Sequence, residues 1–479
     1  MTPLYLSATL RRLEADYAQH VPPLITLAGK AIADWLLARY RGCRFGLLIG
    51  PGNNGSDVLA CAEHLREAGQ DLRCFVPLQR SAGSPNDAAP IAIPGLQIPD
   101  IAGFKECDVI VDGLFGLGLN RTLDLNAVGW LKDVDRLGKP IIAIDVPSGL
   151  DADRGIPKPV ALHATHTLSL LGAKPGYYTA DGRDYCGELH TFGLLPPAVP
   201  RPAADVQLFD CQTSHSQQLF RRHASHKGTH GTLAVFGGSE GMTGAALLAG
   251  RMAAKAGAGK VYVGLLDPIL GVDPLQPELM LQAATDLVKH NDIDLAAIGP
   301  GLGRSQAAQT LLQQLLASRL PLLLDADALN LLARSAELQQ QLRTRAPPSL
   351  ITPHPAEAAR LLSIATAEVQ ADRLAAAHGL QQLLNVTVLL KGSGAICADN
   401  AGISINASGN GALGSAGQGD ILSGLIAALW LQGLSPIDAA RLGAFVHGRA
   451  ADDWRTQHRN GLGLCASELI EPIRILLNQ

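Results

Sequence analysis

The sequence has few charged and few aromatic residues and no block of basic side chains. Of its 479 residues, 17% are charged and 4% aromatic, while 47% are hydrophobic. This composition excludes a long disordered chain, because so little charge and so many apolar side chains favour packed cores. The 39 basic and 43 acidic residues give a formal net charge of −4, so we expect no nucleic-acid partner.

Long apolar runs are also missing. Arg251 and Lys255 interrupt the small-residue segment after Gly244, and the run 421–431 is shorter than the roughly 20 residues of a membrane helix. No basic stretch followed by an apolar one opens the sequence, so we expect no signal peptide and no membrane partner. The eight cysteines form no C-x-x-C pair and no nearby Cys/His cluster at zinc-ligand spacing. We therefore expect a cytoplasmic protein with reduced cysteines.

Short β-type runs alternate with helical patterns along the whole chain. The first series of predicted strands is Phe45–Ile49, Asp71–Val76, Asp108–Asp112, Pro140–Asp145 and Thr167–Leu171. The second series is Thr232–Phe236, Lys260–Gly264, Asp294–Gly299, Pro321–Asp325, Ser349–Thr352 and Val386–Leu390. The intervals are long enough for crossover helices, which predicts two α/β domains with parallel sheets. A proline-rich, polar segment around 195–222 separates them, and we place the domains at 1–212 and 213–479.

Polar residues follow three strands of the first series. The loop GPGNNGSD (50–57) joins a strand to a helix and offers backbone N–H groups together with Asn53 and Asn54. Asp112 ends a second strand, and Asp145 with Ser148 follows a third, so the three loops can line one crevice at the carboxyl edge of the sheet. Asn54, Asp112 and Ser148 carry oxygen ligands for a hard cation. Asp145 suits acid/base chemistry, with a structural turn or helix-cap role for either aspartate as an equal alternative.

The second series carries glycine loops of the same kind. HKGTHG, GPGLG, TPHPAE and KGSG lie at strand ends or helix starts, and a helix cap is the commoner role for a histidine such as His354. The sharpest motif is SGNGALGSAGQGDILSG (408–424), with six glycines that run into an apolar helix and predict an anion site. Lys391 adds a positive charge suited to phosphates. Asp420 at the helix start is favoured over a simple cap as a base for a substrate hydroxyl that faces a nucleotide.

In their joint order these motifs resemble those of the bifunctional NAD(P)H-hydrate repair enzymes. In this family an epimerase domain is fused to an ADP-dependent dehydratase, and NNGSD, DGLFGLG and DVPSG correspond to the epimerase motifs. The resemblance implies a Rossmann-like three-layer domain followed by a ribokinase-like α/β domain. It also implies the substrates NADHX and NADPHX, ADP as co-substrate, and potassium and magnesium as cations. We expect a homo-oligomer.

The resemblance implies a role for each matching residue. In the first domain the hydrate would be bound by Asn53, Asn54, Gly55, Ser56, Asp57, Gly116, Leu117, Gly118, Leu119, Asn120, Arg121, Thr122 and Asp145, and potassium by Asn54, Asp112 and Ser148. In the second domain the S hydrate would be bound by Ala246, Gly301, Gly303, His354, Pro355, Ala356, Glu357, Ala358, Ala359, Arg360 and Asp420. ADP would be bound by Lys391, Gly392, Ser393, Gly394, Ala395, Asn410, Gly411, Ala412, Leu413, Gly414, Ser415, Ala416, Gly417, Gln418 and Gly419. Asp145 and Asp420 would be the catalytic residues.

The chain departs from the family pattern at a few positions. Ser56 and Val58 replace glycines of the first loop, and a Cβ there can narrow the site or disturb a left-handed backbone. HPAE replaces HPGE, and Gln418 replaces a threonine. Two alternatives therefore stay open: a ribokinase-like small-molecule kinase, and a first domain that binds a ligand without catalysis.

Overall fold

The computed structural model describes residues 1–19, 21–78, 96–119, 121–210 and 219–479. These residues form two compact units, Pro3–Val206 and Gln207–Gln479 with Met1–Thr2. The structure divides after Val206, a few residues before the boundary expected at 212/213. The reason is that the strand Val206–Phe209 (β8) pairs with Gly402–Asn406 (β17) of the second unit.

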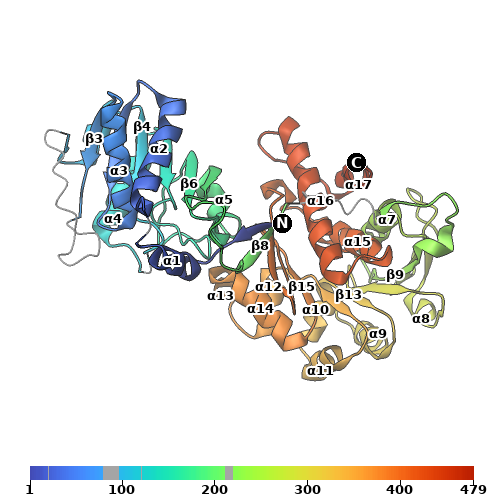
Figure 1. Ribbon diagram of the computed structural model, residues 1–479. Coiled ribbons are helices and arrows are strands. Elements are labelled where there is room, and N and C mark those ends of the chain that lie inside the picture. The colour runs from blue at the N-terminus through green and yellow to red at the C-terminus, as the bar shows by residue number, and fades with distance from the viewer. Residues whose placement is uncertain (20, 79–95, 120, 211–218) are drawn as a thin grey trace. The chain divides into compact units, whose positions relative to one another are not determined.

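The first unit holds a six-stranded sheet in the order β3-β2-β4-β5-β6-β7, and every neighbouring pair is parallel. Its strands are β2 (Arg44–Ile49), β3 (Asp71–Phe75), β4 (Val109–Gly113), β5 (Ile141–Ile144), β6 (His166–Leu170) and β7 (Glu188–Phe192). Its helices are α1 (Ser7–Asp16), α2 (Leu24–Tyr40), α3 (Asn53–Glu67), α4 (Leu125–Arg136) and α5 (Gly182–Cys186), with 3₁₀ helices η1 (Ile101–Glu106) and η2 (Pro175–Tyr177) (Figure 1).

Alternate side chains of these strands enter two different cores. Phe45, Leu47 and Ile49 of β2 pack in the core formed with α2 and α3, whereas Leu48 packs in the core formed with η1 and α4. The strands β4 and β5 divide their side chains in the same way. Successive strand residues point to opposite faces, so both faces of this sheet are covered and the unit has three layers.

The second unit holds an eleven-stranded sheet in the order β1-β8-β17-β16-β15-β14-β13-β12-β9-β10-β11. Its remaining strands are β1 (Thr2–Leu4), β9 (Thr232–Gly237), β10 (Lys260–Leu265), β11 (Met280–Ala283), β12 (Leu295–Ile298), β13 (Leu322–Leu324), β14 (Ser349–Ile351), β15 (Thr387–Leu390) and β16 (Ile396–Asp399). Strand β16 runs antiparallel to β15 and β17, while the pairings from β11 through β15 are parallel.

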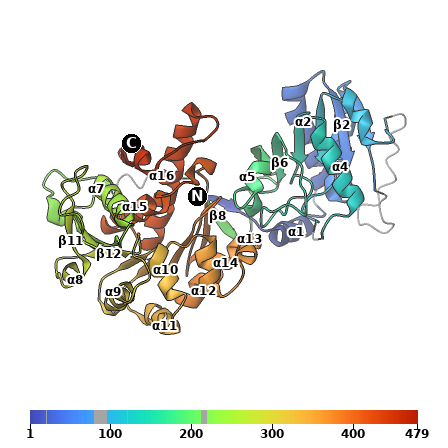
Figure 2. The ribbon, with the colours of Figure 1, turned by 180° about the vertical axis from the view of Figure 1, so that it is seen from behind.

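Helices cover both faces of this sheet as well. On one side lie α7 (Thr243–Lys255), α15 (Gln418–Leu431), α16 (Pro436–Gln457) and α17 (Ala466–Leu476) (Figures 1 and 2). On the other lie α9 (Gln306–Ala317), α10 (Ala326–Leu332), α11 (Ala336–Thr344), α12 (Pro355–Leu362) and α14 (Arg373–Leu384). The shorter elements are α8 (Ala284–Leu287), α13 (Thr366–Ala371), η3 (Lys227–His230) and η4 (Gly411–Leu413).

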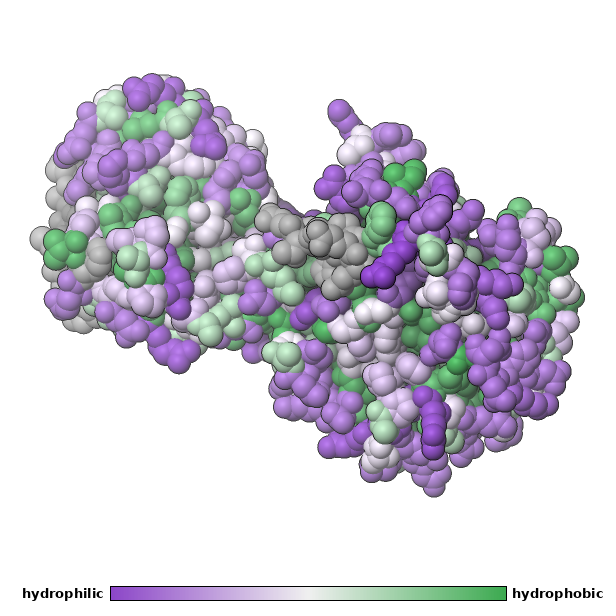
Figure 3. Space-filling model, turned by 45° about the vertical axis from the view of Figure 1, so that its right-hand side comes forward, coloured by the Kyte–Doolittle hydropathy of each residue, from purple (hydrophilic) through white to green (hydrophobic). Residues whose placement is uncertain are grey.

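Hydrophilic residues cover most of the visible surface of each unit, with hydrophobic residues scattered among them (Figure 3). Among the described residues, no helix combines the length and apolar character needed to cross a membrane.

The α/β class and every strand expected from the sequence are confirmed, with ends that differ by one or two residues. The sequence did not predict β1, β7, β8, β11 or the β16–β17 hairpin. The predicted strands are apolar runs buried on both faces, whereas β7 and β11 have half-exposed, mixed side chains and lack that signal.

Candidate functional site

The first unit contains a cavity of about 400 Å³ where its strand order reverses. The chain passes from β2 outward to β3 and then returns to β4 on the other side of β2. Ligands of open parallel sheets bind at such a reversal, beside the carboxyl ends of the strands. The cavity is lined by Arg11, Glu14, Pro51, Gly52, Asn53, Asn54, Asp57, Leu114, Phe115, Gly116, Leu117, Gly118, Leu119, Arg121, Asp145 and Leu170. The loops after β2, β4 and β5 therefore meet as the sequence predicts.

Asn54 lines this cavity, and Phe115 connects it to the fully buried Asp112 and Ser148. The hydroxyl of Ser148 donates to Asp112 Oδ1 at 2.6 Å, and its backbone N–H donates to Asp112 Oδ2 at 2.7 Å. The Phe115 N–H donates to Ser148 Oγ at 2.8 Å, and the Phe115 carbonyl accepts from Asn54 Nδ2 at 2.8 Å. Burial raises the pKa of Asp112 to about 6, against hydrogen bonds from Ser148 and Leu114 that lower it.

The oxygen of the Asn54 amide is the unsatisfied atom of this group. Asn54 Oδ1 is buried and has no hydrogen-bond partner in the part of the chain that the structure describes. Buried polar atoms are normally paired, and a bound cation would supply the partner that this oxygen lacks. The predicted donor set thus fits a potassium ion.

Asp145 is held in place at the other wall. Its φ of 64° lies in the left-handed region, which is uncommon for a residue other than glycine. Its Oδ1 accepts hydrogen bonds from the Leu170 N–H at 2.9 Å and from the fully buried Lys174 ammonium, and its carbonyl accepts from the Tyr177 hydroxyl. No hydrogen bond reaches its Oδ2 among the described residues, so this atom is available to a ligand in the cavity.

Two further carboxyl groups share the cavity with Asp145. Burial raises the pKa of Asp57 well above its ordinary value of 3.8, and the charges of Asp145 and Glu14 raise it further. Burial and then Asp145 also raise the pKa of Glu14. The cavity therefore combines a carboxylate beside a lysine with carboxyl groups that favour holding a proton, which is an arrangement suited to acid/base chemistry.

Ser56 and Val58 do not narrow this cavity. Both lie within α3, neither has a positive φ, and neither lines the cavity. Val58 is fully buried in the core. Gly50 and Gly55 tolerate no side chain, because a Cβ would lie 1.8 Å from the Leu114 carbonyl oxygen at Gly50 and 2.0 Å from the Gly50 carbonyl oxygen at Gly55. The structure therefore shows no narrowing of the cavity by a Cβ at Ser56 or Val58, and the effect of these two residues on the epimerase is left to measurement.

The remaining predicted residues of the first unit lie around this cavity without all lining it. Gly55 and Ser56 are buried behind it in α3, Thr122 is exposed, and Asn120 lies outside the described residues. The sequence analysis missed Arg11, Glu14 and Lys174. A lysine inside the apolar segment that follows β6 was a signal for Lys174, whereas nothing local marks the residues of α1.

In the second unit the glycine loops after β9 and β12 meet at a second reversal of strand order. The Ser239 N–H donates to the Gly301 carbonyl at 2.7 Å, and the Gly303 N–H donates to Asp327 Oδ2 at 2.9 Å. Ala246 is fully buried against this loop pair. Ala246 thus packs against Gly237 and Gly238 of the loop after β9, whereas Gly301 lies against Met242 and Ala245 at the start of α7.

A buried polar cluster links the ends of β13 and β15 to the start of α15. Asp325 Oδ1 accepts from Lys391 Nζ at 2.7 Å, and Oδ2 accepts from the Ser423 hydroxyl at 2.7 Å. Burial lowers the pKa of Lys391, but the charges of Asp325, Glu357 and Asp420 outweigh it and the pKa is raised. Asp325 and Ser423 were not predicted, although Asp325 follows an apolar strand just as Asp112 and Asp145 do.

Asp420 lies in the first turn of α15, where the helix dipole favours negative charge. Among the described residues its carboxylate accepts no hydrogen bond, so it does not act as a helix cap. Burial and then the charge of Asp325 raise its pKa to about 6, while Lys391 lowers it. The helix is fixed by a close crossing with α7, since a Cβ at Gly424 would lie 2.0 Å from the Ala249 carbonyl oxygen.

His354 caps α12. Its Nδ1 accepts from the Ala356 N–H at 3.1 Å, and Glu357 Oε2 accepts from the His354 N–H at 2.8 Å. Ala358 and Ala359 point into the core. Pro355 opens the helix, and Arg360 donates to Asn330 Oδ1 at 2.8 Å. Within the predicted run 354–360, His354 and Arg360 are exposed, and the substrate contacts of this run stay a prediction.

The predicted nucleotide loops lie on either side of Asp420. A Cβ at Gly419 would lie 3.3 Å from Lys391 Nζ, which places the Lys391–Ala395 loop against the start of α15. Asn410 is held by Asp452 of α16 at 2.8 Å, and Gln418 Oε1 lies 3.0 Å from His447 Nε2. Gly411 and the stretch 414–416 are exposed, so this loop is open to a ligand.

Comparison with known proteins agrees with this two-unit arrangement. Residues 233–474 match the family described as NAD(P)H-hydrate dehydratase, and residues 22–176 match the YjeF-related protein N-terminus. A bifunctional NAD(P)H-hydrate repair enzyme from Coxiella burnetii is 35% identical over the full length of both chains. The chain belongs to this family of bifunctional repair enzymes, so the resemblance is confirmed.

Further relatives agree. The bifunctional repair enzyme of Vibrio cholerae is 38% identical over 78% of this chain and 76% of its own length, and that of Escherichia coli is 34% identical over 95% and 89%. A solved Bacillus subtilis structure, an ADP/ATP-dependent NAD(P)H-hydrate dehydratase, is 29% identical with a TM-score of 0.49 and covers 57% of this chain and 98% of its own. As a bifunctional repair enzyme the chain has an epimerase and a dehydratase domain, which leaves the kinase alternative and the non-catalytic first domain without support.

Proposed function

We propose that the second domain, 213–479, removes water from the S form of NADHX and NADPHX with ADP, and that the first domain, 1–212, interconverts the R and S forms. The observation that supports the dehydratase proposal most is the position of Asp420. Its carboxylate is unbonded among the described residues, lies at the start of a helix, and has Lys391 on the neighbouring loop. A base and a phosphate-binding cation therefore stand side by side.

The chemistry of dehydration follows from the poor leaving ability of hydroxide. Asp420 accepts the proton of the hydrate's hydroxyl as that oxygen attacks the terminal phosphorus of ADP and releases AMP. The carbon–oxygen bond of the resulting phosphate ester then breaks, assisted by the electron pair of the ring nitrogen, and phosphate leaves. Loss of a proton from the neighbouring ring carbon to water then restores the dihydronicotinamide ring. Lys391 and the N–H groups at the start of α15 stabilise the charge on the transferred group.

The nucleotide is proposed to lie in the loops that surround Asp420, namely 391–395 and 410–419. Backbone N–H groups of these glycine-rich loops suit phosphate oxygens, and the exposed stretch 414–416 leaves room for the adenosine. A magnesium ion on the phosphates would add charge stabilisation. The hydrated ring is proposed to lie toward Gly301, Gly303 and His354, on the side of Asp420 opposite this loop.

In the first domain, inversion at the hydroxyl-bearing carbon requires one bond of that carbon to break and to form again. Protons must move to and from oxygen as this happens. We propose Asp145 Oδ2 as the group that accepts the proton, since Lys174 and Leu170 fix the carboxylate through Oδ1. Asp57, with its raised pKa, is proposed as a proton donor on the facing wall. Arg121 and the loop 116–122 would hold the rest of the nucleotide.

A potassium ion would be held by Asn54, Asp112 and Ser148, with the carbonyl of Phe115 beside them. The ion would supply a fixed positive charge for the substrate's phosphates or hydroxyl. A cytoplasmic location and a homo-oligomeric state also belong to this proposal, and the oligomeric state can be measured by analytical ultracentrifugation.

The proposal is tested by following the absorbance of reduced nicotinamide on a mixture of R and S hydrates with ADP, ATP or no nucleotide. We expect complete recovery with ADP, faster than the two forms interconvert without enzyme. Asp420→Asn should abolish recovery and keep ADP binding, whereas Asp145→Asn should stop at the S fraction. The exposed Asp286→Asn serves as the matched control. No recovery with either nucleotide contradicts the dehydratase proposal, and full recovery by Asp145→Asn contradicts the role of Asp145.

A further inference from the structure

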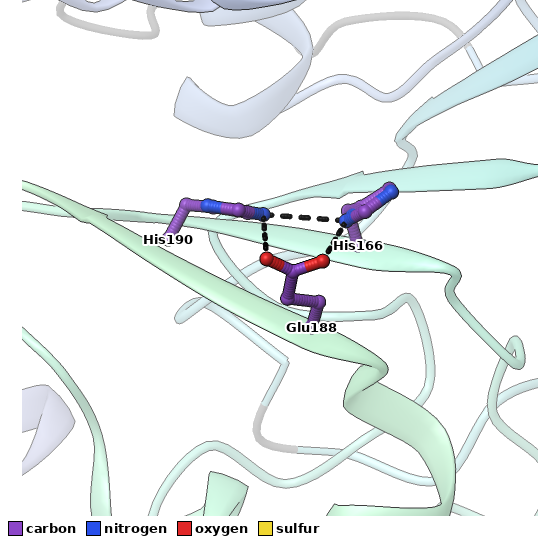
Figure 4. Close-up of side chains that lie close together, drawn as sticks. All are labelled: His166, Glu188 and His190. Atoms are coloured by element: carbon purple, nitrogen blue, oxygen red, sulfur yellow. Dashed lines mark hydrogen bonds and ion pairs between the residues drawn. The ribbon is translucent and has the colours of Figure 1, made fainter.

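The amino ends of β6 and β7 bring two histidines and a glutamate together. His166 is the register partner of Glu188 across the parallel pair, and His190 follows two residues later on β7. Residues two apart on a strand share a face, so all three side chains lie on one side of the sheet. Figure 4 shows them pointing toward one another. They lie at the start of their strands, whereas the cavity of the first unit is built at the carboxyl ends.

The three ligand atoms have the spacing of a metal site. His190 Nε2 lies 3.2 Å from His166 Nδ1, His166 Nδ1 lies 3.4 Å from Glu188 Oε2, and His190 Nε2 lies 3.6 Å from Glu188 Oε1. Zinc bonds of about 2.0–2.2 Å at tetrahedral angles place neighbouring ligand atoms about 3.3–3.6 Å apart. The two ring nitrogens, and each ring nitrogen with its nearer carboxylate oxygen, therefore lie close to this spacing, and one ligand atom from each residue lies within 4.8 Å of the other two.

The surroundings also suit an ion. The imidazoles of His166 and His190 are about one-sixth exposed and Glu188 about two-thirds exposed, so two ligands are fixed and the third leaves an entry path. Trp35 of α2 covers both rings, with centroid distances of 5.1 and 5.0 Å. Its buried Nε1 has no hydrogen-bond partner among the described residues. A water molecule coordinated to a bound ion would give this N–H group an acceptor. Arg39 lies over the Trp35 ring, and its charge opposes that of an ion.

We propose that His166, Glu188 and His190 bind a divalent transition-metal ion of the zinc type, with water in the fourth position. Two imidazoles and a carboxylate are ligands that zinc accepts in proteins. Because β7 is the edge strand of the sheet, the ion joins this strand to β6 and stabilises the edge. The sequence gives no sign of the site, since the ligands come from two strands and 21 residues separate His166 from Glu188.

The test is a zinc titration of the full chain, freed of metal with EDTA, in competition with a chromophoric zinc chelator. We expect about one equivalent of zinc to bind and to raise the melting temperature. His166→Ala, His190→Ala and Glu188→Gln should each weaken binding by about 100-fold or more, since even the loss of a partner outside the ligand set costs 10–100-fold. Cobalt in place of zinc should give the strong visible bands of a four-coordinate ion in the wild type alone.

Matched controls separate this site from other groups that bind zinc. His163→Ala removes an exposed histidine of the same unit, and Cys465→Ser removes an exposed thiol; both should bind zinc like the wild type. Glu188 is largely exposed, so Glu188→Gln should fold normally, as far-UV circular dichroism will show. The proposal is overturned if the wild type binds no zinc beyond that bound by a His166→Ala/His190→Ala double variant, or if Glu188→Gln binds as tightly as the wild type.

Discussion

Lys391 and Asp325 form an ion pair at the ends of two strands that are not neighbours, with 2.7 Å between Nζ and Oδ1. Asp325 follows β13 and Lys391 follows β15, with β14 between them. The pair lies against the first turn of α15 at Gly419, and Asp325 also accepts the hydroxyl of Ser423 from the second turn. It therefore connects the sheet to the helix that carries Asp420.

Replacing Asp325 should destabilise the second unit. Asp325→Asn leaves the Lys391 ammonium without its partner in a mostly buried place, which costs on the order of 3 kcal/mol. Ser423→Ala removes one hydrogen bond from the same carboxylate and should cost only about 1–2 kcal/mol. Urea unfolding of the full chain measures both, with the transition of the second unit identified by its shift when ADP is added. If Asp325→Asn lowers the free energy of unfolding no more than Ser423→Ala does, the stabilising role of the Lys391–Asp325 ion pair is contradicted.

The pKa of Asp420 should determine the pH below which the rate of dehydration falls. A base must be ionised, and burial together with Asp325 raises this pKa to about 6. The rate with saturating ADP should therefore be level above pH 7 and fall about tenfold for each pH unit below about 6. The measurement is the initial rate on purified S hydrate from pH 5 to 8. A profile that stays level down to pH 5 would remove Asp420 from the role of base.

The raised pKa of Asp420 also predicts that its ionised carboxylate destabilises the folded chain. Its folded-state pKa lies above the ordinary 3.8, so between about pH 4 and 6 the folded chain holds more protons than the unfolded chain. Stability therefore falls as pH rises through this window, and the penalty is complete above it. Asp420→Asn should raise the free energy of unfolding by about 3 kcal/mol at pH 7.5 and by much less at pH 4. Equal gains at both pH values would contradict this cause.

Much of both sites could be predicted because their polar residues come directly after predicted strands. Asn54, Asp112 and Asp145 each come after an apolar run, and parallel strands bring their carboxyl ends to one edge. Asp420 was visible through the glycines around it. These residues can be predicted from the order of strands and loops alone, and the hydrophobic pattern of the sequence indicates that order.

The rest depends on contacts that no local pattern records. Glu14 reaches the cavity from α1, which precedes the sheet, and its neighbours in the sequence carry no motif. The sequence left the effect of Ser56 and Val58 on the site open, because it does not show that α3 begins at Asn53 and includes both residues. His166 and Glu188 meet only through the pairing of β7, a strand that the apolar pattern does not reveal.

The open oxygen of Asn54 predicts a potassium-dependent first domain. Asn54→Ala removes that ligand, so R-to-S conversion should fall about 10–100-fold and the rise of the melting temperature in potassium over choline should disappear. The exposed Asn126→Ala on α4 is the control and should keep both effects. A wild type whose melting temperature is the same in potassium, sodium and choline would contradict the cation site, whatever its activity.

Restoring the family's glycines should weaken the first unit and leave its catalysis unimproved. Val58 is fully buried and packs against Gly113, where a Cβ would lie 2.3 Å from Val58 Cγ2. Val58→Gly creates a cavity and adds a glycine to a helix, which together should cost about 3 kcal/mol. Ser56→Gly should cost about 1–2 kcal/mol, since it adds a helical glycine and removes the hydroxyl that donates to the Gly52 carbonyl at 3.3 Å. Thermal unfolding and R-to-S conversion per folded molecule test this, and a faster epimerase in either variant would show that these side chains obstruct the site.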